Sequence, residues 1–211
     1  DTLVAEWTAA QKTYSEGMRQ VTASEEYKKA RADKDTQKIK ELTEKLVRPD
    51  GKAFGARALE LADQAGGDGG LKFLAYAATN FADKDTGKAV LERVQKSHLK
   101  SPKLTDLLEN PMGLSRAVGT EEADAFLNRV IAENPHQLCQ AWATYWQGKN
   151  ILQAIRSKRD ATEDEKAAAT AQADKLFAAA APLAAGTEFA DKIGAPVFEK
   201  EHLQVGMEVP E

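Results

Sequence analysis

The chain has 211 residues, 42% hydrophobic and 29% charged, with 29 basic and 33 acidic side chains and a net charge of −4. This composition can bury a hydrophobic core and differs from that of a disordered chain. The charges are interspersed without a basic face, which argues against a nucleic-acid partner. No apolar run approaches the roughly 20 residues of a membrane-spanning helix.

Residues 1–48 are expected to form a long helix followed by a charged connection. Apolar side chains recur every three or four positions, which is the spacing of one helical face. They are Leu3, Trp7, Ala10, Tyr14, Met18 and Val21. Residues 22–37 are mostly charged and indicate a solvated helical stretch or a mobile connection. A short helix is expected at residues 39–46, and turn residues end it at 49–51.

Residues 49–195 are expected to form successive short helices, of which the one near residues 71–81 is apolar on nearly all sides and should be buried. The helix-cap candidates are Asp50, Asp68, Asp85, Ser101, Thr120 and Asn134. Alternate members of this set lie 33 or 35 residues apart. A period of about 34 residues is that of tetratricopeptide (TPR) repeats, although their usual side-chain signature is not visible. Two architectures stay open: a degenerate TPR-like array of antiparallel helix pairs, or an irregular bundle with evenly spaced caps.

The clearest helix–turn–helix spans residues 120–156. Thr120 is expected to cap its first helix, because a threonine oxygen accepts from the unsatisfied N–H groups of the first turn. Asn134 and Pro135 end that helix, since a residue before proline is pushed out of the α region. Pro135 is then expected to open the next helix at its first position.

Three aromatic residues cluster on the second helix of this hairpin. Trp142 and Tyr145 lie on its apolar stripe and are predicted to be buried. Trp146 falls off the stripe, so contact with the preceding helix or a place in a groove stays open, but core packing is predicted for all three residues.

A capping box of Thr162 and Glu165 opens the last long helix, which is rich in alanine and ends near Pro182 and Gly186. No segment before residue 195 alternates like a strand. The predicted fold class is therefore all-α.

The histidines and the cysteine give no sign of a catalytic or metal site. His98, His136 and His202 have no partner at the spacing of metal ligands, so structural roles are expected. Cys139 is the single cysteine and forms neither an internal disulfide nor a two-cysteine redox motif. We expect it to be a buried, unreactive thiol.

Other candidate motifs also lead to structural interpretations. The glycine-rich segment 66–70 follows no strand and precedes no Lys-Ser/Thr pair, so a phosphate-binding loop is rejected and an inter-helix turn is predicted. Two carboxylate pairs, Asp106 with Glu109 and Glu121 with Glu122, are expected on helix surfaces. We therefore predict no catalytic, cofactor-binding or metal-binding residue and no enzyme activity for this chain.

The last residues differ in character from the rest. Leu203, Val205, Met207 and Val209 alternate with polar residues or glycine, which is the period of a strand. The segment 205–210, Val-Gly-Met-Glu-Val-Pro, resembles the V-G-x-x-x-P start of redoxin domains, the thioredoxin-fold family of TlpA-like and AhpC/TSA-like proteins. The helical part is similar to regions that precede such domains in some exported bacterial proteins, through stretches like 133–136 and 198–203.

This resemblance implies a domain boundary and a function. Residues 196–211 would be an extended tail, the linker and first strand of a redoxin domain whose cysteine motif lies beyond residue 211. The chain would be a non-catalytic accessory domain that positions a thiol–disulfide oxidoreductase or peroxidase domain in an exported protein. Its partners would be that domain, another protein or a second copy. The compartment is otherwise open, because one cysteine and a start without Met do not fix it.

Two further hypotheses belong to other classes. One is a free-standing TPR-like module that binds a protein or peptide in its concave face. The other is a small-molecule binding bundle or enzyme, which the lack of convergent polar residues disfavours.

Overall fold

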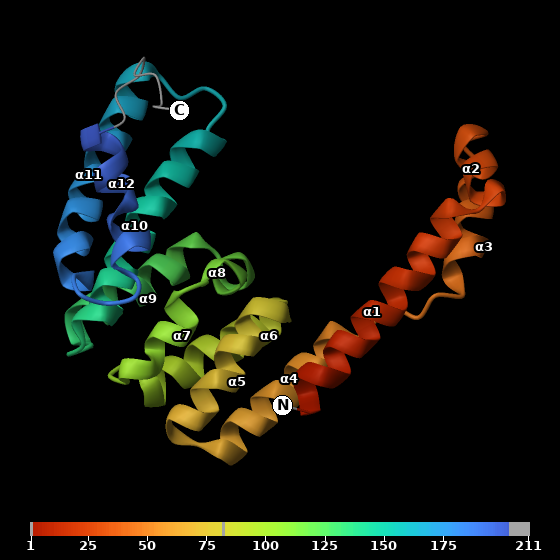
Figure 1. Cartoon of the computed structure of the whole chain (residues 1–211), viewed down its shortest axis with the longest axis horizontal. Helices are drawn as coiled ribbons and strands as arrows, with labels where there is room; N and C mark the ends of the chain where they lie inside the picture. Colours follow the sequence, from red (N-terminus) through yellow and green to blue (C-terminus); the bar gives the residue numbers. More distant parts are fainter. Residues whose placement is uncertain (1, 82, 203–211) are drawn as a thin grey trace. The chain divides into compact units, whose positions relative to one another are not determined.

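The computed structural model describes residues 2–81 and 83–202, with side chains described up to residue 197 (Figure 1). Over these residues it is all-helical, with 83% helix and no strand, which confirms the predicted fold class. None of the described helices is both long and apolar enough to cross a membrane. The chain divides into two compact units, Asp1–Arg57 and Ala58–Glu211, and each is described by itself.

The N-terminal unit contains the predicted long helix and the predicted short helix near residues 39–46, and the charged stretch between them forms one further helix. Its elements are α1 (Thr2–Ala23), α2 (Glu25–Ala32), α3 (Thr36–Glu44) and the first half of α4 (Gly51–Ala65). Ser24 caps α2 and Asp35 caps α3, each accepting a hydrogen bond from a first-turn N–H group. These caps break the charged stretch into short helices, as expected for side-chain oxygens at helix starts. Trp7 packs edge-on against Phe54, with ring centroids 5.0 Å apart.

The C-terminal unit is a bundle built around α5 and α10. Its elements after α4 are α5 (Gly67–Asn80), α6 (Lys84–Arg93), the π-helix η1 (Val94–His98), the 3-10 helix η2 (Pro102–Leu104), α7 (Thr105–Leu108), α8 (Met112–Val118), α9 (Thr120–Glu133), α10 (Gln137–Ser157), α11 (Glu163–Ala184) and α12 (Ala190–His202). α5 contacts α6, α7 and α8, which confirms its predicted central position, and α10 contacts α9, α11 and α12. α10, α11 and α12 lie side by side (Figure 1). The TPR-like repeat stays a prediction.

Trp142 is the largest side chain in the core and is 0% exposed, as predicted. It meets Tyr145 and Phe189 edge-on, at centroid distances of 5.8 and 5.5 Å, and the Lys192 ammonium lies 4.8 Å from the centre of its ring. Its Nε1–H is buried without a hydrogen-bond partner among the described residues. The ring therefore joins α10 to α12 through packing and the Lys192 contact, without a hydrogen bond to a described residue.

Both predicted helix starts in the α9–α10 hairpin are wrong by one or two residues. Gly119, at φ +95°, is the N-cap of α9, and Thr120 is its first helical residue. Glycine reaches positive φ without a Cβ clash, so the chain turns there and leaves Thr120 inside the helix. α10 begins at Gln137 with His136 as its N-cap, so Pro135 lies before the helix.

Asn134 holds this turn and is 1% exposed. Its Nδ2 donates to the carbonyl oxygens of Leu99 at 2.7 Å and Ser101 at 3.2 Å, and its Oδ1 accepts from the N–H of His136 at 2.8 Å. The Gln140 side chain donates to the Asn134 carbonyl at 2.7 Å. The predicted helix end is thus also a buried junction with a segment 33 to 35 residues earlier.

Of the other four predicted caps, two are confirmed and two are wrong. Asp50 and Ser101 accept hydrogen bonds from the backbone N–H groups that follow them, as expected. Asp85 instead lies in the first turn of α6, and Asp83 is the cap. Asp68 lies in the first turn of α5.

The linker expected from residue 196 is helical up to His202, because α12 runs through Pro196. Proline inside a helix removes a hydrogen bond and costs about 3 kcal/mol. Packing opposes that cost: Ile193, one turn earlier, is 0% exposed, and α12 packs on α11. The predicted alternation at 203–209 lies outside the described residues.

Candidate functional site

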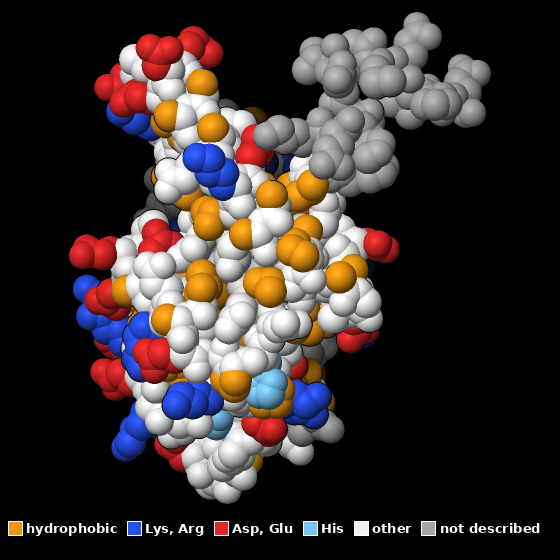
Figure 2. Space-filling model, turned by 90° about the vertical axis from the view of Figure 1, so that its left-hand side faces the viewer, with side chains coloured by type: hydrophobic (Ala, Val, Ile, Leu, Met, Phe, Trp, Pro, Cys, Tyr) orange, Lys and Arg blue, Asp and Glu red, His pale blue; other side chains and the backbone are white. Residues whose placement is uncertain are grey.

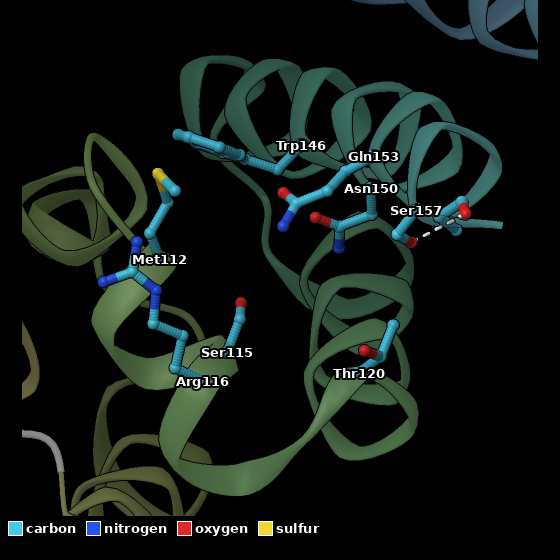
Figure 3. Close-up of a pocket in the computed structure, with 9 residues that line it drawn as sticks. Met112, Ser115, Arg116, Thr120, Trp146, Asn150, Gln153 and Ser157 are labelled. Carbon is cyan, nitrogen blue, oxygen red and sulfur yellow. Dashed lines mark hydrogen bonds between the residues drawn. The ribbon is translucent and has the colours of Figure 1, made fainter. Parts of the chain in front are cut away.

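A groove of about 310 Å³ opens between α8, the start of α9 and α10. Its lining residues are Met112, Ser115, Arg116, Thr120, Trp146, Asn150, Gln153, Ala154 and Ser157. Figure 3 shows Met112 and Arg116 on α8 across from Trp146 and Gln153 on α10. Trp146 lines this α8–α10 groove and is half-buried, so the core packing predicted for all three aromatic residues holds for Trp142 and Tyr145 but not for Trp146.

Backbone packing holds the two walls in place. A Cβ on Gly113 would lie 2.0 Å from the carbonyl oxygen of Ala78, so α8 approaches α5 as closely as only glycine allows. On the opposite wall, the Trp146 Nε1–H donates to the Leu108 carbonyl at 2.6 Å. This bond fixes the direction of the indole, which is half-buried. The groove is therefore formed before any ligand arrives.

The polar groups of the groove fall into two sets. Asn150 is held by a hydrogen bond from its Nδ2 to Asp124 at 2.7 Å. Arg116 and Gln153 are exposed and form no side-chain hydrogen bond with any described residue. Met112 is also exposed, at 38%. The groove thus presents one thioether, one indole and free guanidinium and amide donors to solvent.

Cys139 is a buried thiol, as predicted, and is 0% exposed. Its sulfur lies 3.5 and 3.6 Å from the carbonyl oxygens of Pro102 and Ser101. Burial raises the pKa of the Cys139 thiol to about 11. The thiolate is the reactive form of cysteine, so this side chain is a poor nucleophile at neutral pH.

One predicted surface pair belongs to a larger acidic depression. Asp106 and Glu109 line a hollow of about 540 Å³ together with Glu188 and His136. Burial, followed by the charges of Asp106 and Glu188, raises the pKa of Glu109, while Lys192 lowers it. The sequence did not reveal Glu188, because it reaches the hollow from the turn between α11 and α12.

The histidines predicted to be structural lie apart from one another and differ in burial. His136 is exposed at the start of α10, whereas His98 is buried, at 7% exposure, at the end of η1. The side chain of His202 lies outside the described residues. Within the described part of the chain, no group of three or more His, Cys, Asp and Glu residues is placed to hold a metal ion.

The face of α10 to α12 offers a different surface. Figure 2 shows hydrophobic side chains scattered among uncharged ones, with charged groups toward the margins. Between Lys166 and Glu188, the only charged residues are Asp174 and Lys175. Hydrophobic side chains scattered in this way are normal on a protein surface.

Comparison with protein-family models, with curated proteins and with solved structures found no match.

Proposed function

We propose that this chain is a non-catalytic helical domain that docks and positions a redoxin domain through the α8–α10 groove. The observation that carries the proposal is the meeting of Met112, Arg116 and Trp146 at one preformed opening. Methionine, arginine and tryptophan are enriched at protein interfaces, and tryptophan and arginine dominate their energetic centres.

Each of the three residues suits docking for a physical reason. Trp146 is already oriented by its bond to Leu108, so little conformational entropy is lost when a partner covers it. Met112 is flexible and adapts to the shape of an apolar partner side chain. Arg116 keeps its planar donors free for a carboxylate, with which arginine forms paired hydrogen bonds. The groove thus fits an apolar side chain with a carboxylate beside it.

The redoxin partner is supported by the resemblance of residues 205–210 and by the state of Cys139. A thiol with a pKa of about 11 is protonated at neutral pH. Thiol–disulfide and peroxide chemistry needs a thiolate. In this proposal the reactive cysteine belongs to the domain that follows residue 211, and the helical domain supplies position.

The test begins with the reading frame and continues with the full-length protein. The frame beyond residue 211 is expected to encode a redoxin domain with its cysteine motif. Hydrogen exchange of residues 112–118 and 146–157 is then compared between the full-length protein and residues 1–211. We expect slower exchange in the full-length protein, lost in Arg116→Glu and kept in Arg159→Glu, which reverses an exposed charge between α10 and α11.

Two results would reject the proposal. One is a reading frame without a redoxin motif, which would favour the free-standing module. The other is equal exchange of the groove residues with and without the following domain.

A further inference from the structure

A second cavity, independent of the groove, lies where α4 turns into α5 beside the end of α6 and η1. Its volume is about 190 Å³. The lining residues are Ala62, Asp63, Gly66, Gly67, Leu74, Arg93, Ser97 and His98. The glycines belong to the segment in which the sequence predicts only an inter-helix turn.

His98 is the reason to regard this cavity as a site. It is 7% exposed, and its imidazole forms no hydrogen bond with any described residue, yet it lines the cavity. Its ring nitrogens are not among the fully buried unpaired atoms of the described residues, so they reach the solvent in this cavity and are open to a ligand there. The π-helix η1 carries both Ser97 and His98 on the wall of the cavity. Short π-helical turns are frequent at functional sites.

The first turn of α5 supplies backbone donors to the same cavity. α5 has 14 residues, and its N-cap Gly66 provides no side-chain hydrogen bond. Asp68, the cap expected from the sequence, instead accepts from the Ser101 hydroxyl at 2.6 Å. Nothing lies within 4 Å of the position that a Cβ would take on Gly66 or Gly67, which have φ of +59° and +45°. The first N–H groups of a helix have no partner within it, and those of Gly67 and Asp68 donate no hydrogen bond to another described residue.

Arg93 adds a fixed guanidinium. Its Nε and Nη2 donate to the two carboxylate oxygens of Asp63 at 2.9 and 2.8 Å, and its Nη1 donates to the Ala89 carbonyl at 3.2 Å. Three of its five N–H groups are therefore used, and two remain. The charges of Arg93 and Asp63 offset each other. The positive end of the α5 dipole and the His98 imidazole then favour an anion, and the negative charge of Asp68 opposes its binding.

We propose that this cavity binds the oxyanion head of a small molecule, a phosphate or carboxylate group. The N–H groups at the start of α5, the free N–H groups of Arg93, the Ser97 hydroxyl and the His98 imidazole are its donors. Oxyanions bind readily at helix N-termini for the same electrostatic reason. A volume of 190 Å³ equals about six water molecules at roughly 30 Å³ each, which leaves room for several atoms beyond the head.

The sequence could not show this arrangement. The sequence argues against a phosphate-binding loop, because no strand precedes the glycines and no Lys-Ser/Thr follows them. In the structure, a cation and a hydroxyl come from Arg93 and Ser97, about 30 residues later, and reach the glycines only through the packing of η1 against α5.

The test is a titration of residues 1–211 with inorganic phosphate and, separately, with acetate, followed by NMR of backbone amides and histidine rings. We expect saturable shifts at Gly67, Asp68 and the His98 ring, and the tighter anion identifies the head group. His98→Gln should weaken binding at least tenfold, and Ser97→Ala roughly three- to tenfold. His136→Gln removes an exposed histidine from α10 and should bind as the parent does.

Several outcomes would overturn the proposal. One is no chemical-shift change at these residues with either anion at tens of millimolar. Another is an equal loss of anion affinity in His98→Gln and His136→Gln. A third is an anion affinity of Ser97→Ala equal to that of the parent. If His98→Gln loses its helical circular dichroism, Ser97→Ala and the mapped amides decide, because Ser97 is exposed and its truncation spares the core.

Discussion

Replacing Trp142 with alanine tests the packing that joins α10 to α12. Trp142 is fully buried, and truncating a buried tryptophan costs about 3–5 kcal/mol. Its two edge-on ring contacts and the ammonium of Lys192 are lost with it, and each such contact contributes roughly 0.5–1.5 kcal/mol.

One feature of the site lowers the expected loss. The buried Nε1–H lacks a partner, and an unsatisfied buried donor costs about 1–3 kcal/mol in the folded state. Trp142→Ala removes this penalty, so we expect a net loss of about 2 kcal/mol. Trp142→Phe keeps an aromatic ring and also removes the unpaired donor, so its loss should be about 1 kcal/mol or less.

Urea unfolding followed by circular dichroism at 222 nm measures these differences without relying on tryptophan fluorescence. For a domain of this size, about 2 kcal/mol corresponds to a fall in Tm of roughly 4–8 °C. Trp146→Ala is the matched control, because Trp146 is half-buried and faces the groove. If Trp142→Ala costs no more than Trp146→Ala, Trp142 is not the centre of the core. A loss for Trp142→Phe as large as for Trp142→Ala would show that the indole N–H has a partner.

Three further predictions concern backbone approach, charge and the thiol. Gly113→Ala should lower the free energy of unfolding by about 1–3 kcal/mol, because its Cβ would meet a backbone oxygen at 2.0 Å. Gly194→Ala, with open space around its Cβ, should raise it by up to about 1 kcal/mol, and the reverse order in urea would contradict this reasoning. Glu109→Gln should raise the Tm at pH 7, because the raised pKa of Glu109 means that folding disfavours its charged form. The gain should vanish as the pH falls below the ordinary glutamate pKa of about 4.3, where the side chain is neutral in both states. A gain in Tm that persists at pH 3 would refute this cause. Cys139 should react with a thiol reagent at pH 8 only upon unfolding, and Cys139→Ala should cost about 1 kcal/mol, whereas fast labelling of the native protein would contradict its burial.

Helical periodicity predicts the helices with a clear apolar stripe, such as α5 and α9–α11, but it misses α8 and α12, and the stripe of α1 is buried only at Leu3. Trp142 is buried as its place on the apolar stripe predicts, whereas Trp146, also predicted to pack in the core, faces a groove because it lies off that stripe. The helix starts were harder to predict, since adjacent residues compete for the cap. At the start of α9, Gly119 takes positive φ and so displaces Thr120.

Pro196 shows a different limit of sequence reasoning. Its local preference predicts a break, yet the burial of Ile193 and the contact with α11 keep α12 intact. The cavity at His98 shows the same limit for sites. Its donors come from Gly67 and Arg93, which are neighbours only after folding, so no spacing in the sequence marks them.

The junction at Asn134 also affects how readily the protein undergoes spontaneous deamidation. Asparagine amides decay when the nitrogen of the next residue attacks the side chain and closes a succinimide ring. The next residue is Pro135, whose nitrogen carries no hydrogen and cannot close a stable ring of this kind. The amide that binds the carbonyls of Leu99 and Ser101 is therefore shielded from spontaneous deamidation. Conversion to aspartate would replace two donated hydrogen bonds with a buried negative charge, so the proline preserves the junction over the lifetime of the molecule.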